Sequence, residues 1–286
     1  MTRLEAATPN APLLQRAIPQ SGESLPAVGL GTWQTFDVDA DAQGRAAARE
    51  TLRLFVELGG RVIDSSPMYG SSESVVGELA AELGVQSSLF LATKVWTTGR
   101  SQGIEQMQTS AQRLRTKRID LMQVHNLLDL RAHLKTLRAW KEEGKIRYIG
   151  FTHYTVGAHR ELAALIKKEQ PDFVQFNYSL VTRDAEKELL PVAAEYRTAV
   201  LINRPFEGSS LFQKVRGEQL PAWATELDCA SWAQFFLKYI LSHPAVTCAI
   251  PGTRDPKHLT DNMGAALGRL PGQKLRQQMV EYMAGS

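Results

Sequence analysis

Short apolar runs alternate along the chain with longer segments in which apolar residues recur every three or four positions. A short apolar run is typical of a strand buried on both faces, and the longer period is typical of an amphipathic helix. The pattern predicts eight strands, at residues 27–31, 61–64, 89–93, 119–124, 146–150, 173–176, 200–202 and 246–250. Helical stripes such as Leu130, Leu134 and Leu137 lie between them. We therefore expect an α/β fold in which helices cover a parallel sheet.

Several residues mark helix ends. Gly84 and Gly144 each follow a helical segment, where glycine commonly ends a helix. Asp255 before Pro256 predicts an N-cap followed by proline in the first turn. Beyond that helix, residues 271–286 form one more amphipathic stretch, which we expect to pack outside the main fold.

The predicted strands indicate a closed barrel rather than an open sheet. Their ends at Asp64, Lys94, His125 and Gly150 recur at about the interval expected when roughly 250 residues are divided among eight units. An open doubly wound sheet would carry G-x-G-x-x-G after its first strand, whereas this strand ends Gly-Leu-Gly-Thr-Trp. We expect one (β/α)8 barrel domain over residues 1–286, with a polar N-terminal stretch at 1–20 and an active-site loop at 204–226.

Composition narrows the function classes. Of 286 residues 43% are hydrophobic and 22% charged, which suits a globular protein with a full core. The net charge of +3 is spread along the chain, so nothing indicates nucleic acid, and no apolar run reaches the roughly 20 residues that cross a bilayer. Two isolated cysteines predict neither a disulfide scaffold nor a zinc site. Without a visible signal peptide we expect a cytoplasmic protein, although a signal removed earlier remains open.

Four polar residues follow consecutive predicted strands, where a barrel carries its catalytic groups: Asp64, Tyr69, Lys94 and His125. A tyrosine titrates near 10 and is a poor acid at neutral pH, but a lysine ammonium nearby would lower its pKa. An aspartate would keep the lysine charged, and a histidine could hydrogen-bond a carbonyl oxygen. Each residue alone also fits a structural role; the combination predicts a site that protonates a carbonyl.

The segment Val-Ile-Asp-Ser-Ser-Pro-Met-Tyr-Gly at residues 62–70 resembles the signature of the aldo-keto reductases, and the later lysine and Val-His match that family in order. The resemblance runs over nearly the whole chain. It implies reduction of an aldehyde or ketone to an alcohol by hydride transfer from a nicotinamide cofactor. In this family Tyr69 would be the general acid, with Lys94 tuning it, Asp64 supporting Lys94 and His125 orienting the substrate.

The resemblance also implies an extended NADP bound across the barrel mouth, without a Rossmann unit and without metal. The expected contacts at the nicotinamide end are Thr32, Asp64, Thr152, His153 and Gln175; the expected substrate pocket is Trp33, Met68 and Trp96. At the other end, Gly252, Thr253 and Arg254 precede a helix whose free N–H groups and dipole would attract a phosphate. His258, Asp261 and Asn262 match adenosine-contacting positions.

Some positions depart from the family pattern. Thr152-His153 stands where Ser-Asn is common, and Asn203 stands where an aromatic residue commonly stacks on the nicotinamide ring. Arg204 and Phe206 are then expected to contact the cofactor instead. His258 replaces an arginine, so the preference for NADP rests on Arg254, and NAD remains possible.

The altered nicotinamide pocket keeps a second function open, a cofactor-binding regulatory or scaffold protein of the same family with little turnover. The expected partner is a small carbonyl substrate of unspecified identity, and a monomer is the default.

Overall fold

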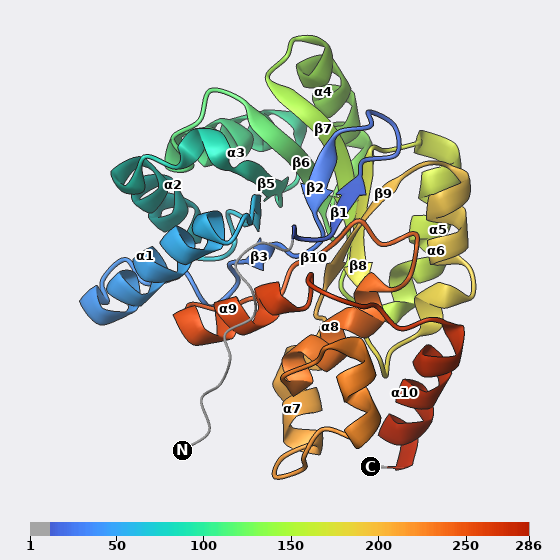
Figure 1. The fold of residues 1–286 in the computed structure, drawn as a ribbon. Helices are drawn as coiled ribbons and strands as arrows, with labels where there is room; N and C mark the ends of the chain where they lie inside the picture. Colours follow the sequence, from blue (N-terminus) through green and yellow to red (C-terminus); the bar gives the residue numbers. More distant parts are fainter. Residues whose placement is uncertain (1–11, 286) are drawn as a thin grey trace.

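The computed structural model of the protein describes residues 12–285, in which eight parallel strands form one curved sheet (Figure 1). In chain order these strands are β3 (Leu30–Gly31), β4 (Val62–Asp64), β5 (Phe90–Val95), β6 (Ile119–His125), β7 (Ile146–Thr152), β8 (Phe173–Asn177), β9 (Ala199–Asn203) and β10 (Cys248–Ala249). Each pairs in parallel with the next. Isolated bridges from Val28 to Ala249 and from Gly31 to Gly252 join the first strand to the last. The predicted barrel is confirmed.

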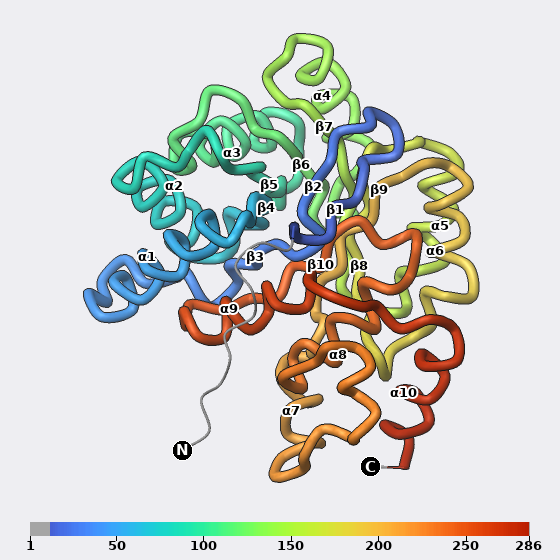
Figure 2. Tube along the Cα trace, in the orientation of Figure 1, coloured from blue at the N-terminus to red at the C-terminus, as the bar shows by residue number. Residues whose placement is uncertain are grey.

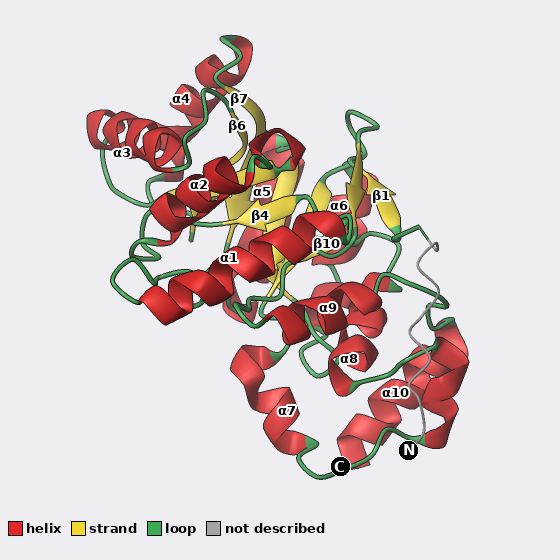
Figure 3. Cartoon of the chain, turned by 60° about the vertical axis from the view of Figure 1, so that its left-hand side comes forward, coloured by secondary structure: helices red, strands yellow, loops and turns green. Residues whose placement is uncertain are grey.

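Helices alternate with the strands and form a ring outside them, which is easiest to follow in the tube of Figure 2. They are α1 (Ala42–Glu57), α2 (Ser72–Leu83), α3 (Arg100–Arg113), α4 (Leu130–Glu142), α5 (His159–Glu169), α6 (Leu189–Glu195), α8 (Trp232–Leu241) and α9 (Pro256–Gly264). Short 3-10 turns are η1 (Gln86–Ser88), η2 (Val156–Ala158) and η3 (Asp184–Glu186). The first and last helices of the ring, α1 and α9, lie side by side in the front of Figure 3.

The predicted helix ends are confirmed. Gly84 follows α2 in the left-handed region at φ 68°, which glycine adopts without steric cost. Gly144 also has a positive φ, two residues after α4. At the start of α9, Asp255 Oδ1 accepts a hydrogen bond of 2.8 Å from Lys257 N, and Pro256 is the first helical residue.

Alternate strand residues point into the barrel, and their character changes along the barrel axis. Near the amino ends of the strands the inward side chains are apolar and form one buried cluster, which includes Val62, Phe90, Leu121 and Phe173. A larger apolar cluster fills the space between sheet and helices. Two or four residues further along β4 to β9 the inward positions become polar, so the barrel has an apolar floor and a polar mouth.

The N-terminal segment is more ordered than its polar composition suggested. Residues 1–11 of the expected polar stretch lie outside the described part of the chain, but β1 (Gln15–Ala17) pairs with β2 (Ser24–Pro26) in an antiparallel hairpin. Ile18 and Leu25 from this hairpin are fully buried in the cluster inside the barrel. These two side chains close the barrel floor, which the polar composition of the stretch did not indicate.

The segment at residues 204–226 contains three short helices: η4 (Glu207–Ser209), α7 (Ser210–Lys214) and the start of η5 (Ala222–Leu227). Aromatic contacts, such as that of Phe212 with Phe236, hold it against α8. The final helix, α10 (Gln273–Gly285), packs outside the ring as expected: Arg276 hydrogen-bonds Tyr178 at 2.9 Å, and Lys214 Nζ donates to Met283 O at 2.6 Å.

Within residues 12–285 no helix is long and apolar enough to cross a membrane. Both cysteines are free, Cys248 buried in the barrel and Cys229 partly exposed.

Candidate active site at the barrel mouth

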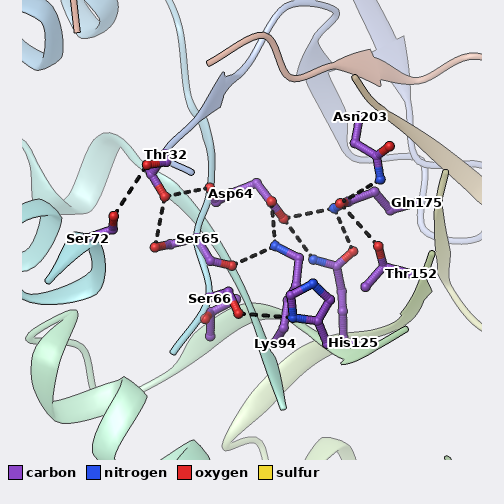
Figure 4. A network of polar contacts seen from close by, with 12 residues as sticks. Thr32, Asp64, Ser65, Ser66, Ser72, Lys94, His125, Thr152, Gln175 and Asn203 are labelled. Carbon is purple, nitrogen blue, oxygen red and sulfur yellow. Dashed lines mark hydrogen bonds and ion pairs between the residues drawn. The ribbon is translucent and has the colours of Figure 1, made fainter. Parts of the chain in front are cut away.

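The inward positions at the carboxyl ends of six strands, β4 to β9, hold a polar network, drawn in Figure 4. The period of two along each strand explains its membership. The inward positions near the floor are followed, two or four residues later on the same face, by the network members, which are Asp64, Lys94, Gln123, His125, Thr152, Gln175 and Asn203. The sequence placed six of these seven in the site; Gln123 was missed.

Lys94 and Asp64 form the buried centre of this network. Their side chains are 0% and 4% exposed, and Lys94 Nζ donates to Asp64 Oδ2 at 2.6 Å and to Ser65 O at 2.7 Å. Burial disfavours the ammonium, but the charge of Asp64 and the contact with Tyr69 outweigh it and raise the lysine pKa. Lys94 is therefore a fixed cation, held within β5 rather than just beyond it.

Tyr69 lies in the turn after β4, with the Lys94 ammonium 4.9 Å from its ring centroid. The turn is held by Asp37, whose Oδ1 accepts from both the backbone N and the hydroxyl of Ser71, each at 2.8 Å. Burial raises the pKa of Tyr69, and Lys94 lowers it by less. The expectation of a lowered pKa was thus wrong in its net direction: the lysine acts as expected, but burial is the larger effect.

His125 ends β6 beside Tyr69, with the two rings edge to face at 5.9 Å and 84°. Its Nδ1 lies 3.1 Å from Ser66 Oγ. Burial, reinforced by the nearby charges of Lys94 and His153, lowers the pKa of His125 to about 3. The imidazole is therefore neutral at neutral pH and has one N–H to donate.

Two glutamines extend the network from Asp64 across the barrel. Asp64 Oδ1 accepts 2.9 Å hydrogen bonds from Gln123 Nε2 and from Gln175 Nε2. The Gln175 Oε1 accepts from Thr152 Oγ1 and from Asn203 Nδ2. Both ends of Gln175 are thus engaged within the protein, so a cofactor carboxamide would have to share or replace one of these bonds. A glutamine two residues before His125, on the same face of the strand, was the signal that would have identified Gln123.

Gly150 provides room for Gln123. A Cβ at Gly150 would stand 2.9 Å from Gln123 Cγ, closer than side chains tolerate. The strand-end glycine noted in the sequence lies inside β7, where its missing side chain admits the glutamine.

His153 and Asn203, which depart from the family pattern, are both held by hydrogen bonds. His153 Nδ1 accepts from the backbone N of Tyr154 at 3.0 Å, so the neutral ring carries its proton on Nε2, which has no partner in the described chain. Asn203 Nδ2 donates to His153 O at 3.1 Å, while the buried Asn203 Oδ1 has no hydrogen-bond partner among the described residues. Thr32 is buried on the other side of Asp64, and its Oγ1 donates to Asp64 O at 3.1 Å (Figure 4).

The N-terminus of α9, where we expect a phosphate to bind, is already capped by a side chain of the protein. Asp255 Oδ1 accepts from Lys257 N at 2.8 Å and from His258 N at 3.4 Å, so the first N–H groups of α9 are not free. The cap competes with any anion there. Arg254 is exposed, and its guanidinium has no hydrogen bond or ion pair with residues 12–285.

The other predicted cofactor residues lie around this helix and the β9 end. His258 is exposed, with Nδ1 4.0 Å from Asp255 Oδ2, and Asn262 is buried. Asp261 Oδ1 accepts from Gln234 Nε2 at 2.8 Å. Arg204 follows β9 with φ 48° and no side-chain partner within the described chain. The expected cofactor residues Gly252, Thr253 and Phe206 are respectively exposed, buried and packed against Phe212.

Large apolar side chains stand exposed at the loops above the network. Trp33, Met68 and Trp96, the expected substrate pocket, are 49%, 38% and 41% exposed, and the Trp96 ring lies 6.3 Å from His125. Tyr154, which the sequence did not single out, is 50% exposed beside His153. Isolated exposed aromatics are ordinary, whereas several in neighbouring loops are typical of a surface that binds a ligand.

A cavity of about 830 Å³ runs along α10, where Arg183, Glu186 and Arg276 line it, and its lining includes none of the network residues. The described residues hold no cluster of three or more His, Cys, Asp or Glu side chains arranged to bind a metal.

Comparisons with known proteins agree with this geometry. A protein of Escherichia coli strain K12, "Methylglyoxal reductase YeaE", is 33% identical over 281 residues, which cover 94% of this chain and 96% of that protein. "Aldo-keto reductase YhdN" of Bacillus subtilis strain 168 is 26% identical and covers 92% of this chain and 90% of its own. The crystal structure of an aldo/keto reductase from Klebsiella pneumoniae in complex with NADP and acetate superposes with a TM-score of 0.78 at 25% identity, covering 93% and 94% of the two chains.

The sequence model described as "Aldo/keto reductase family" matches residues 27–278, which is most of the chain. With a barrel of the same fold and relatives that match over nearly their whole length, the chain belongs to the aldo/keto reductase family.

Proposed function

We propose that the protein reduces an aldehyde or ketone to an alcohol, with NADPH as the reductant and Tyr69 as the proton donor. The observation that carries the proposal is the buried set at the barrel mouth. In this set Lys94, paired with Asp64, lies 4.9 Å from the centroid of the Tyr69 ring, and the His125 ring lies 5.9 Å from the same ring. This set supplies what a carbonyl reductase requires from its protein: a proton donor, a fixed positive charge and a second hydrogen-bond donor.

The proton donor begins the reaction carrying its proton. Because burial keeps the pKa of Tyr69 above its ordinary value, the free enzyme holds a neutral phenol at neutral pH. As negative charge develops on the carbonyl oxygen, the proton moves from the Tyr69 hydroxyl to that oxygen. Lys94, held charged by Asp64, then stabilises the phenolate that remains. Lys94 thus interacts with a charge that forms only in the transition state. It therefore lowers the activation barrier of the reaction without tightening the binding of the substrate.

His125 supports the same oxygen. Its neutral ring can donate one hydrogen bond, and its place between Tyr69 and Trp96 is next to the exposed aromatic rim. A donor fixed in a buried site stabilises an oxyanion more than a donor in water does.

The residues at the mouth fit a nicotinamide cofactor. Asn203 Oδ1 is a buried acceptor without a partner, and the His153 Nε2–H is a donor without one, so together they match the NH2 and oxygen of a carboxamide. The unpaired guanidiniums of Arg204 and Arg254 suit the pyrophosphate and the 2'-phosphate. When bound there, NADPH would supply the hydride. The Klebsiella relative crystallised with NADP supports this assignment.

The rim of Trp33, Met68, Trp96 and Tyr154 favours a small carbonyl compound with an apolar or planar body. Because the relative YeaE is named a methylglyoxal reductase, we include 2-oxoaldehydes among the proposed substrates.

The direct test is oxidation of NADPH by the purified protein over a panel of aldehydes, ketones, 2-oxoaldehydes and sugars, repeated with NADH. We expect steady oxidation that depends on the carbonyl compound. Tight NADPH binding without turnover of any compound would contradict the proposal and favour the regulatory or scaffold function, which the unusual Thr152-His153 and Asn203 positions motivate.

Arg254→Ser tests the proposed cofactor preference. Loss of a charge-assisted contact to the 2'-phosphate should weaken NADPH binding by about tenfold or more, because such bonds contribute roughly 1.5–3 kcal/mol. NADH lacks that phosphate and should bind as before. Fluorescence titration gives both dissociation constants, with the exposed Arg216→Ser on the 204–226 segment as the matched control. Equal weakening for the two cofactors would argue against Arg254 as the phosphate ligand.

A further inference from the structure

The Ser66 hydroxyl is buried against the histidine of the proposed site. Ser66 is 0% exposed and His125 6% exposed, and Ser66 Oγ lies 3.1 Å from His125 Nδ1 (Figure 4). Ser66 stands between Asp64 and Tyr69 in the loop after β4. Its only side-chain partner in the described chain is the imidazole.

The local donors decide which of the two groups gives the proton. The backbone N of Met68 donates to Ser66 Oγ at 3.4 Å, and a backbone N–H can only donate. The Ser66 proton is then free for Nδ1, the one acceptor beside it among the described residues. With the opposite direction, Nδ1–H would donate to Ser66, and the hydroxyl proton would be buried without a partner, which is unfavourable.

The direction of this bond fixes the rest of the ring. A neutral imidazole has one protonated nitrogen, so acceptance at Nδ1 puts the proton on Nε2. His125 Nε2 has no partner in the described chain, so it is the nitrogen that is available to a molecule bound at the barrel mouth. In the other tautomer, Nε2 would turn a lone pair toward a carbonyl oxygen and repel it.

We propose that Ser66 is a positioning residue that holds His125 in the tautomer with its proton on Nε2, so that the ring presents a donor to the substrate oxygen. The inference rests on the proposed function for its consequence, the donation to substrate, but the tautomer itself is a property of the protein alone. The hydroxyl that makes this hydrogen bond belongs to Ser66, two residues after Asp64 of the ion pair.

The first test measures the tautomer in the full-length protein without substrate. Long-range 1H–15N correlation spectra of histidine-labelled protein at pH 7 distinguish the two neutral tautomers, and a His125→Gln sample identifies the His125 signals. We expect the pattern of the Nε2–H form in the wild type and a shift toward the Nδ1–H form or a mixture in Ser66→Ala. The Nδ1–H pattern in the wild type would overturn the proposal even if Ser66→Ala did not fold.

Two further variants separate positioning from a packing role. Ser66→Thr keeps a hydroxyl and should restore the wild-type spectrum, and Ser110→Ala removes an equally buried serine hydroxyl on α3 and should leave it unchanged. Unchanged His125 signals in Ser66→Ala would refute the proposal.

Kinetics connect the tautomer to the reaction. We expect Ser66→Ala to lower kcat by about three- to tenfold with little change in KM, the size of one neutral hydrogen bond, because the donor contacts charge that develops in the transition state. Ser66→Thr should recover most of kcat. A protein with the expected tautomer but no carbonyl reduction would refute the proposed function alone, whereas turnover with an unaltered tautomer in Ser66→Ala would refute only the role of Ser66.

Discussion

At the scale of single residues, the barrel mouth combines groups that would be unstable there alone. Lys94 is a fully buried cation that stays charged because Asp64 lies 2.6 Å away, and Asp64 is itself held by the amides of Gln123 and Gln175. Tyr69 stays protonated because it is buried, and His125 stays neutral for the same reason. Burial and one charge pair thus set the protonation states that the proposed reaction requires.

Replacing Asp64 tests this dependence. Asp64→Asn leaves Lys94 as a buried charge without its partner, and breaking one side of a buried pair lowers the free energy of unfolding by about 3 kcal/mol or more. The double variant Asp64→Asn with Lys94→Met removes the charge and should recover part of the loss. Urea unfolding measures both.

The control is Asp39→Asn, because Asp39 is 72% exposed and 4.0 Å from Arg45, and an exposed pair contributes at most about 1 kcal/mol. Equal losses at the two positions would show that the buried pair contributes no more to the free energy of unfolding than the exposed pair does.

Some site residues can be recognised from the sequence, and others only from the contacts that the fold creates. Asp64, Lys94 and His125 interrupt apolar runs with charge or an imidazole, and that contrast is visible in the chain. Gln123 also interrupts such a run, but its contact with Asp64 depends on the strand register, in which Lys94 is aligned with Gln123. The role of Ser66 depends on the turn that brings its hydroxyl to His125. Serine is common in turns, so its identity alone carried no information.

At the scale of elements, the alternation of strands and helices located all eight barrel strands to within a few residues, because buried parallel strands have an apolar composition that loops lack. The hairpin of β1 and β2 was missed, since each strand has only three residues and their outward side chains are polar. The short helices in residues 204–226 were also missed, because their stability comes from aromatic contacts with α8 rather than from a local pattern.

Close packing of α2 against α3 gives a prediction for one helical glycine. A Cβ at Gly77 would lie 2.1 Å from the backbone oxygen of Arg113, so Gly77→Ala should lower the free energy of unfolding by about 1–3 kcal/mol. Helix propensity alone would predict a gain of roughly 1 kcal/mol. Urea unfolding decides between the two signs.

Gly157→Ala is the matched control, since nothing lies within 4 Å of a Cβ there. A stabilised Gly77→Ala protein would mean that the two helices do not approach each other as described.

At the scale of the whole molecule, buried histidines make stability depend on pH. Burial lowers the pKa of His125 from its ordinary value of 6.5 to about 3, and it also lowers the pKa of His153, His159 and His243. Between these values the unfolded chain binds a proton that the folded chain does not, so stability falls as pH falls below about 6.5. Glu73, whose pKa is raised by burial, acts in the opposite direction.

We therefore expect the free energy of unfolding to drop between pH 7 and pH 5 by about 2 kcal/mol from His125 alone. Urea titrations at the two pH values measure it. His125→Gln should reduce the drop, and the exposed His258→Gln should leave it unchanged. A protein that is equally stable at both pH values would contradict the neutral, buried state assigned to these rings.

The whole barrel also explains why the site needs every part of the chain. The hairpin closes the floor, the inward apolar residues fill the interior above it, and the polar mouth above them holds the buried ion pair of Lys94 and Asp64.

The measurement that tests the central claim most directly is turnover by Tyr69→Phe with the best carbonyl substrate, together with its dissociation constant for NADPH. The account predicts a kcat at least about 100-fold below wild type, the low end for loss of a general acid, with NADPH binding little changed. Tyr196→Phe, far from the mouth on the C-terminal end of α6, should retain wild-type turnover. A Tyr69→Phe enzyme that turns over its substrate at the wild-type rate would contradict the assignment of Tyr69 as the proton donor.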